Sequence, residues 1–148
     1  MKNTVYTHIL KKMISKSKLS YCELENSVFV TDGIVGFFLR DYNQVFNLEM
    51  MENSSGIKHI VDLDFSFEES PLKPTGEYYS VGDELVQKFE AGDGRIVNVD
   101  SQFIKKFFPI KRGEYVLDQK EDLGPVFAIN TETVKCDGLM MPIREGKS

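Results

Sequence analysis

The chain has 148 residues, of which 41% are apolar and 28% charged, and this composition is typical of a folded globular protein. Its length predicts one domain over residues 1–148 and allows a core without disulfides or metals. No stretch approaches the roughly 20 apolar residues of a membrane span, and Lys11 and Lys12 interrupt the first segment too early for a signal peptide. We therefore expect a soluble, cytoplasmic protein with no membrane contact.

The N-terminal segment predicts an amphipathic helix. Its apolar residues recur at helical spacing and define a stripe that we expect to be buried: Val5, Ile9, Leu10, Met13 and Ile14. The solvated side is then mostly basic and carries His8, Lys11, Ser15 and Lys18, with Lys12 and Lys16 on one flank.

Three short strands are predicted next, at residues 20–24, 27–31 and 34–40, where β-forming residues predominate. Glu25-Asn26 and Asp32-Gly33 separate them, and Asn and Gly tolerate the positive φ of tight hairpins. The pattern indicates a helix that leads directly into an antiparallel meander.

The middle of the chain predicts further strands. We expect strands at residues 45–51 and 57–67, separated by a turn at residues 53–56, and the second of them alternates like a half-buried strand with an acidic outer face. A loop with Pro71 and Pro74 is predicted at residues 68–76. Strands at residues 77–81 and 85–89 and a turn at residues 91–94 complete this part.

A second helix follows a strand at residues 95–99. Asp100 or Ser101 is expected to cap it, Pro109 to end it, and its apolar face to join the core: Phe103, Ile104, Phe107 and Phe108. Strands at residues 114–118, 125–130 and 137–143 come next. A helix followed by three strands thus occurs twice, which suggests a duplicated unit in an α+β fold with two helices on one face of antiparallel sheet.

The charge is divided unevenly along the chain. Residues 1–18 carry +5 without an acidic residue, residues 100–113 carry +3, and the remainder carries −13, for a net charge of −5. Lysines often decorate solvated helices, so exposed surface is one interpretation. The other is a surface that contacts nucleic-acid phosphates without reading bases, formed by both helices: Lys11, Lys12, Lys16, Lys18, Lys105 and Lys106.

Two segments resemble bacterial DNA sliding clamps. Residues 28–33 (VFVTDG) resemble the strand-and-turn ATDG segment that follows a helix in clamp domains, and residues 138–144 (GLMMPIR) are similar to the last clamp strand. The resemblance implies a duplicated β-α-β-β-β domain with helices facing DNA, in a DNA-replication context. Residues 34–36 (IVG) replace the basic residue that usually follows the clamp glycine. Clamp rings contain six such domains, so encircling DNA would require a homo-oligomer.

Other chemistry is weakly indicated. Cys22 and Cys136 lie in apolar runs, which favours buried free thiols, although one disulfide or a Cys–His nucleophile stays an alternative. Asp62 and Asp64 share a predicted strand face and suit a hard cation, but the alternation explains them as solvated. Residues 90–95 (EAGDGR) predict a hairpin turn and not a phosphate loop. We expect no cofactor, no metal and no enzymatic activity.

Two functions remain open. The first is a non-catalytic clamp-like domain that binds DNA phosphates. The alternative is a protein-interaction module of a phage or mobile element that acts on a host or replication protein, with its acidic surface as the working face. Tyr78 and Tyr79 are the aromatic residues best placed for such a partner contact.

Overall fold

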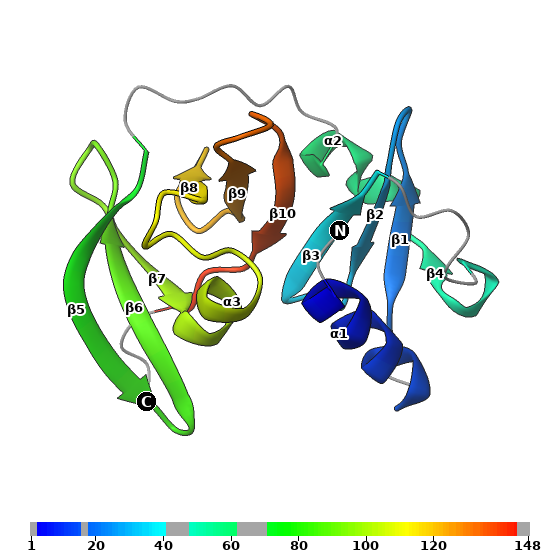
Figure 1. Ribbon diagram of the computed structural model, residues 1–148, viewed down its shortest axis with the longest axis horizontal. Coiled ribbons are helices and arrows are strands. Elements are labelled where there is room, and N and C mark those ends of the chain that lie inside the picture. Colours follow the sequence, from blue (N-terminus) through cyan, green and yellow to red (C-terminus); the bar gives the residue numbers. More distant parts are fainter. Residues whose placement is uncertain (1–2, 16–17, 41–47, 62–70, 145–148) are drawn as a thin grey trace. The chain divides into compact units, whose positions relative to one another are not determined.

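The computed structural model describes residues 3–15, 18–40, 48–61 and 71–144. The chain forms two compact units, Met1–Asp64 and Phe65–Ser148, in which strands predominate and helices are short (Figure 1). The α+β class is therefore confirmed. The expectation of one domain stays a prediction, because two compact units can belong to the same domain.

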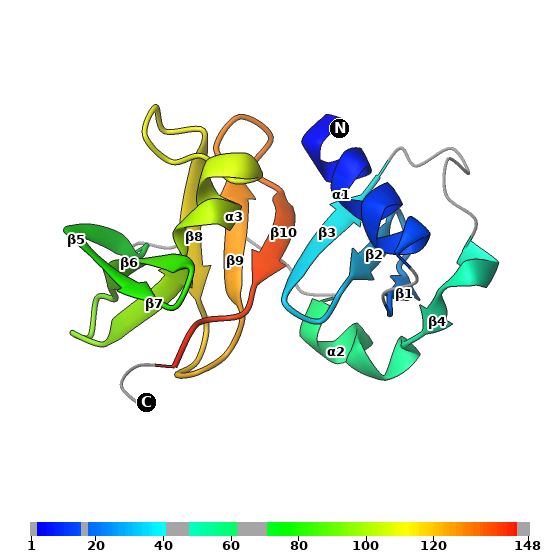
Figure 2. The ribbon, with the colours of Figure 1, turned by 90° about the horizontal axis from the view of Figure 1, so that it is seen from below.

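Unit 1 begins with the predicted helix and meander. Helix α1 (Asn3–Ile14) precedes β1 (Ser20–Glu23), β2 (Val28–Thr31) and β3 (Val35–Leu39), and each strand pairs antiparallel with the next. α1 lies against one face of β2 and β3 (Figure 2). These four elements confirm the sequence-based assignment, including the turn at Asp32-Gly33, where Gly33 has a φ of +94°.

The rest of unit 1 differs from expectation. A 3-10 turn, η1 (Leu48–Met50), leads to the short strand β4 (Glu52–Asn53), which pairs parallel with β1, so the sheet is mixed and its order is β4-β1-β2-β3. A second 3-10 turn, η2 (Ser55–Ile57), continues into α2 (Lys58–Val61).

The strands predicted at residues 45–51 and 57–67 are wrong where the structure describes them. Residues 45–47 and 62–67 lie outside the described part of the chain. Ile57, Ile60 and Val61 are spaced i, i+3 and i+4, so they satisfy a helix as well as a strand. The backbone N–H of Ile57 bonds to the carbonyl of Ser54, and this turn starts the helical path.

Unit 2 opens with a three-stranded antiparallel sheet in the order β5-β6-β7. Its strands are β5 (Lys73–Val81), β6 (Glu84–Glu90) and β7 (Ile96–Asp100), and the predicted turn at residues 91–94 joins the last two. The predicted loop at residues 68–76 is wrong from Lys73 onward, while residues 68–70 are not described. β5 can include Pro74 because it forms the edge of this sheet, where a missing N–H does not interrupt a ladder.

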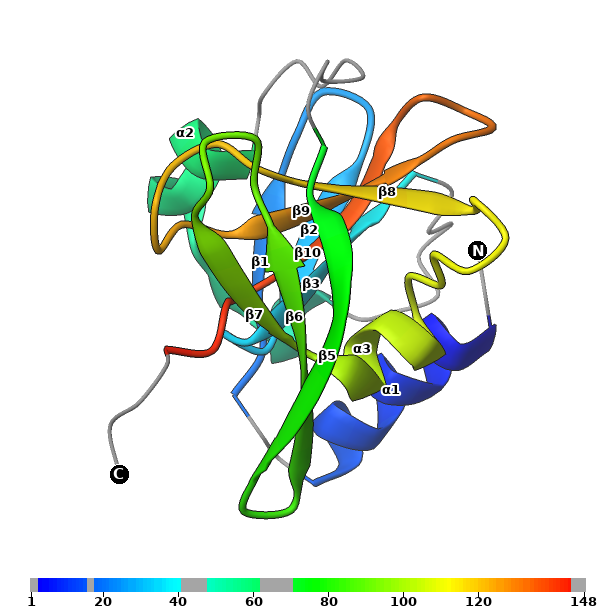
Figure 3. The ribbon, with the colours of Figure 1, turned by 90° about the vertical axis from the view of Figure 1, so that its left-hand side faces the viewer.

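The end of this hairpin, residues 78–85, is called the arm. β7 pairs with β6 only from Val86 onward, so residues 80–85 have no third strand beside them, while Tyr78 and Tyr79 pair with the part of β6 that β7 supports. Gly82, at a φ of +60°, and Asp83 close the turn, and a glycine with positive φ at this position suits a two-residue hairpin loop. β5 and β6 extend past α3 at this end (Figure 3).

Helix α3 (Ser101–Lys106) follows β7 directly. Asp100, one of the two predicted cap residues, is its N-cap and accepts a 2.9 Å hydrogen bond from the N–H of Gln102. Ile104, Phe107 and Phe108 are buried, which confirms the apolar face, and Phe103 is half-buried.

The second sheet of unit 2 is an antiparallel meander of β8 (Tyr115–Gln119), β9 (Val126–Asn130) and β10 (Cys136–Met140). All three strands were predicted, although β10 ends at Met140. The chain then turns away, and the N–H of Ile143 bonds to the carbonyl of Asn98 on β7. A helix followed by a three-stranded meander is therefore present in both units.

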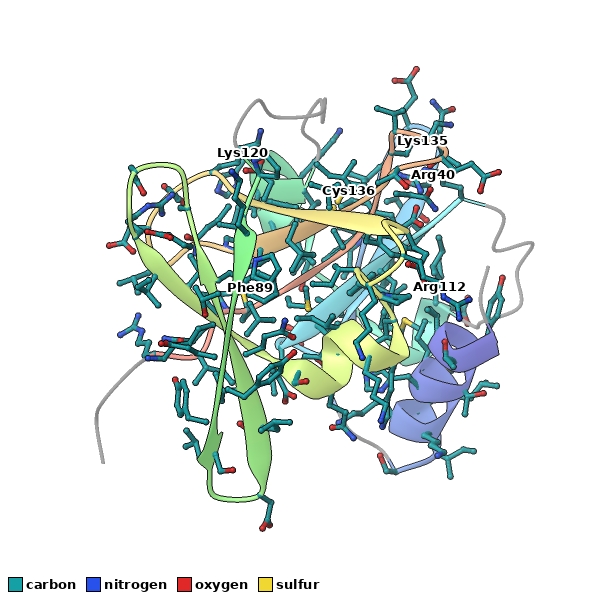
Figure 4. The ribbon with its side chains drawn as sticks, turned by 60° about the vertical axis from the view of Figure 1, so that its left-hand side comes forward. Arg40, Phe89, Arg112, Lys120, Lys135 and Cys136 are labelled. Atoms are coloured by element: carbon teal, nitrogen blue, oxygen red, sulfur yellow. The ribbon has the colours of Figure 1, made fainter. Side chains whose placement is uncertain are left out.

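Both units have a buried core. β3 is buried along its whole length in unit 1, and Phe89, Phe108 and Phe127 are among the most deeply buried side chains of unit 2. Figure 4 labels Phe89 on β6. Cys22 and Cys136 are buried free thiols, as expected, and no disulfide joins them.

Gly36 provides a test of packing in unit 1. A Cβ at this position would lie 2.2 Å from Cζ of Phe29, a buried ring that also packs against Phe38. We expect Gly36→Ala to lower the free energy of unfolding by at least about 1–3 kcal/mol, because overpacking displaces the ring. Gly56→Ala is the control, since a Cβ there meets nothing within 4 Å. Equal denaturation midpoints in urea for both variants would contradict the packing of Gly36 on Phe29.

Candidate functional site

Four basic residues of unit 2 fall within residues 105–112, as two pairs at the end of α3 and in the turn after it. Lys105 and Lys106 occupy the last turn of α3, and Lys111 and Arg112 follow in the turn that precedes β8. All four side chains are exposed, and within the described residues none makes an ion pair. We call these four residues the basic segment, and Figure 4 labels Arg112.

Toward the N-terminus from the basic segment, the first acidic residue in the sequence is Asp100. Its buried carboxylate caps α3. Glu114, on the other side, accepts a 2.8 Å hydrogen bond from the backbone N–H of Arg112. This bond fixes the turn and leaves the guanidinium of Arg112 exposed. The segment therefore keeps its positive charge available to an anion.

The lysines of α1 have different environments. Lys11 is exposed and has no ion-pair partner among the described residues. Lys12 is only partly exposed, with Nζ 3.9 Å from Oδ2 of Asp32, and Nζ of Lys18 lies 3.1 Å from Oε2 of Glu52. The Lys18 pair is highly exposed and therefore contributes little to stability. Lys16 lies outside the described residues, and nothing places the two helices relative to each other.

The predicted buried stripe of α1 is partly wrong. Val5 and Ile9 are buried, but Leu10 is 44% exposed and Ile14 is 81% exposed. His8 was expected on the solvated side, yet it is partly buried and contacts both Asp32 and the ring of Phe37. The packed face is centred on Val5 and Ile9 with His8 on its flank, so the helix is rotated relative to the stripe predicted from apolar spacing.

Asp32 joins the helix to the meander. Its Oδ1 accepts hydrogen bonds from the N–H groups of Ile34 and Val35 at 2.9 and 3.0 Å, and its Oδ2 lies 3.1 Å from Nε2 of His8. Thr31 adds a second tie across the same turn, because its hydroxyl accepts from the N–H of Gly33 and donates to the carbonyl of Val35. The Thr-Asp-Gly part of the clamp-like segment therefore has a structural explanation within this chain.

These contacts control the ionisation of Asp32. Burial of the carboxylate, whose side chain is 7% exposed, raises its pKa, but the hydrogen bond to His8 and those from Val35 and Ile34 outweigh burial. The net result is a pKa lowered to about 2. The carboxylate is thus charged in the folded protein at all ordinary pH values and serves as an acceptor.

A second polar cluster lies in unit 2 and is satisfied internally. The hydroxyl of Tyr115 donates to Oδ2 of Asp137 at 2.7 Å, and the side-chain amide of Asn130 donates to the same oxygen at 3.1 Å. Burial, and then the hydrogen bond to the Asp137 carboxylate, raise the pKa of the Tyr115 phenol. The phenol therefore remains protonated, and the cluster links β8, β9 and β10.

The described residues contain neither a cluster placed to hold a metal ion nor a helix that could span a membrane. No group of three or more His, Cys, Asp or Glu side chains among them is placed to hold a metal ion, while Asp62 and Asp64 lie outside the described part. In the same residues no helix is long and apolar enough to cross a membrane. The chain matches no known family model, no curated protein and no solved structure at a significant level.

Sequence reasoning located the charged segments but missed two surfaces. Lys111 and Arg112 were counted in the charge of residues 100–113 and were not assigned to the phosphate-binding set, although only residues 107–110 separate them from Lys106. The exposed apolar pair Leu10 and Ile14 was assigned to the core. Spacing alone cannot detect it, because a wide apolar stripe does not show which part of it is covered.

The Asp32 contacts predict an acid-sensitive unit 1. A carboxylate with a lowered folded pKa stabilises the protein above its unfolded pKa of about 3.9, and this contribution of about 2 kcal/mol is lost as the pH falls toward about 2. Asp32→Asn should lower the free energy of unfolding near neutral pH by about 1–2 kcal/mol and flatten this acid dependence. Urea denaturation at several pH values measures both effects.

The matched control is Asp83→Asn at the exposed tip of the arm, which removes one carboxylate without removing any of the hydrogen bonds described here. It should leave the acid dependence unchanged. An acid limb of the same size in Asp32→Asn and in the unsubstituted chain would show that Asp32 does not tie α1 to the meander.

Proposed function

We propose that the chain is a non-catalytic binding protein that contacts nucleic-acid phosphates through the basic segment of unit 2, with Lys11 of α1 as an additional contact. The observation that carries this proposal is that four cations close together in the sequence, Lys105, Lys106, Lys111 and Arg112, are exposed and make no ion pair among the described residues. Cations that neutralise phosphates release the counterions condensed on the nucleic acid, and a cation without a carboxylate partner can do so without first breaking an internal ion pair.

A structural explanation accounts for only part of this charge. Lysines in the last turn of a helix stabilise its negative end, and Lys105 and Lys106 fit that role. Lys111 and Arg112 lie beyond the helix, where the effect has faded, so the helix dipole does not account for them. Lysine presents a point charge and no fixed hydrogen-bonding edge, which favours backbone contact over base reading.

The clamp-like resemblance supports a DNA-replication context for this binding. Both units place a helix directly before a three-stranded antiparallel meander, and β7 precedes α3 in a β-α-β-β-β order. We propose a duplicated clamp-like arrangement with both helices toward DNA. The element order and the two short segments support this arrangement. The Thr-Asp-Gly part of the first segment also closes the turn between β2 and β3 by its own hydrogen bonds.

A second candidate is a protein-interaction module, such as one carried by a phage or mobile element against a host protein. The observation that favours it is the arm, where Tyr78, Val81 and Leu85 are exposed beside Asp83 and Glu84. An acidic, apolar surface repels phosphate and suits a protein partner. Binding of the chain to DNA at moderate salt would favour the first function over this one.

Charge reversal at α3 tests the phosphate proposal. Lys105→Glu with Lys106→Glu should weaken binding to a fluorescent DNA duplex by about tenfold or more, and should reduce the slope of log K against log salt by about two units. Fluorescence anisotropy over a salt series measures both quantities. Duplexes of different sequence should bind alike, because the contact is to phosphates.

The control carries the same change of charge at other exposed lysines of unit 2, Lys73→Glu with Lys135→Glu. It should retain most of the affinity. Lys12→Glu is unsuitable as a probe of binding, because a carboxylate there would face Asp32 and destabilise unit 1. Equal losses in the α3 variant and the control would mean that net charge, not the basic segment, governs binding.

A further inference from the structure

The arm exposes apolar side chains on a ribbon with little support. Val81 is 47% exposed and Leu85 48% exposed in its two-stranded part, and Tyr78 is exposed on the edge strand where β7 still pairs with β6. A two-stranded ribbon is marginally stable in water by itself, and exposed large apolar residues near its end add nothing to the core of unit 2. A bound partner would bury these residues and stabilise the arm.

The charge of the arm restricts the kind of partner. Residues 78–85 contain Asp83 and Glu84 and no basic residue, and within the described part of the chain neither carboxylate makes an ion pair. Nucleic acids and anionic lipid surfaces are repelled by this charge. The arm therefore fits a protein surface that is apolar and positively charged.

Such a surface is present on α1 of the same chain. Leu10 and Ile14 are exposed and lie one helical turn apart, so their side chains form a short apolar ridge. Lys11 lies beside this ridge and is exposed, and residues 1–18 contain five lysines and no acidic residue. The ridge and its lysine match the arm in both polarity and charge.

We propose that the arm of one copy of this chain docks on the exposed Leu10–Ile14 ridge of α1 in a second copy. Val81 or Leu85 covers the ridge, and Asp83 and Glu84 approach Lys11. The two surfaces differ, so the contact is head-to-tail, and a pair joined by one such contact retains one unused arm on one copy and one unused α1 on the other. Repetition of the contact builds assemblies larger than a dimer.

This contact uses no residue of the basic segment, and Lys11 is the one residue that it shares with the proposed nucleic-acid function. Self-association can therefore be measured without nucleic acid, and Lys105→Glu with Lys106→Glu should leave it unchanged. Failure of DNA binding would leave this inference intact, and failure of self-association would leave the basic segment available to phosphates.

Sedimentation equilibrium of the full chain tests the contact. The mass should rise above the 16.9 kDa of one chain as concentration increases. Leu85→Ser on the arm and Ile14→Ser on α1 should each raise the dissociation constant by about tenfold, the size expected for removing an apolar anchor. Leu123→Ser, an exposed leucine in the β8–β9 turn, is the control and should associate like the unsubstituted chain.

A mixture of the two variants distinguishes head-to-tail docking from other modes. Leu85→Ser keeps an intact α1 and Ile14→Ser keeps an intact arm, so a mixture should form a one-to-one pair and nothing larger. Full assembly by Ile14→Ser alone would overturn the proposal in favour of arm-to-arm pairing. A mass of one chain at every concentration would overturn it as well, and would leave the arm to a different protein.

Discussion

Unit 1 depends on the contacts that the carboxylate of Asp32 makes. It closes the turn between β2 and β3 through two backbone N–H groups, and its other oxygen contacts His8 on α1. A charged acceptor is stronger than a neutral one, and it is retained here despite burial because every bond to it favours the ionised form. Asp100 has a related role in unit 2, where it ends β7 and begins α3 without an intervening loop.

Helix and meander assignments were predictable from sequence where turn chemistry and periodicity agree. Asp32-Gly33 and the Asp100 cap specify their local conformations directly, since each needs one residue type at one position. The segment at residues 57–61 was not predictable, because its apolar spacing suits two structures and the preceding Ser54 turn decides between them. The length of β5 was underestimated, because Pro74 normally interrupts a strand and is tolerated only at the edge of a sheet.

For the candidate site too, some properties were predictable from composition, whereas others depend on three-dimensional geometry. The sequence identifies which segments are basic, but ion pairing is a matter of three-dimensional neighbours. Lys12 and Lys18 have acidic partners from distant parts of unit 1, and the basic segment of unit 2 has none in the described residues. Among the described residues, the basic segment thus has more exposed cations without an ion pair than α1, where Lys11 is such a cation.

The two cysteines have a consequence for how the protein opens. Cys22 lies on β1 and Cys136 on β10, so each unit contains one buried thiol. A thiol reagent can reach a buried sulfur only when the strand around it separates transiently from its neighbours. The two modification rates therefore report the local opening of each half of the chain independently, and equal rates would indicate that both halves open in one cooperative event.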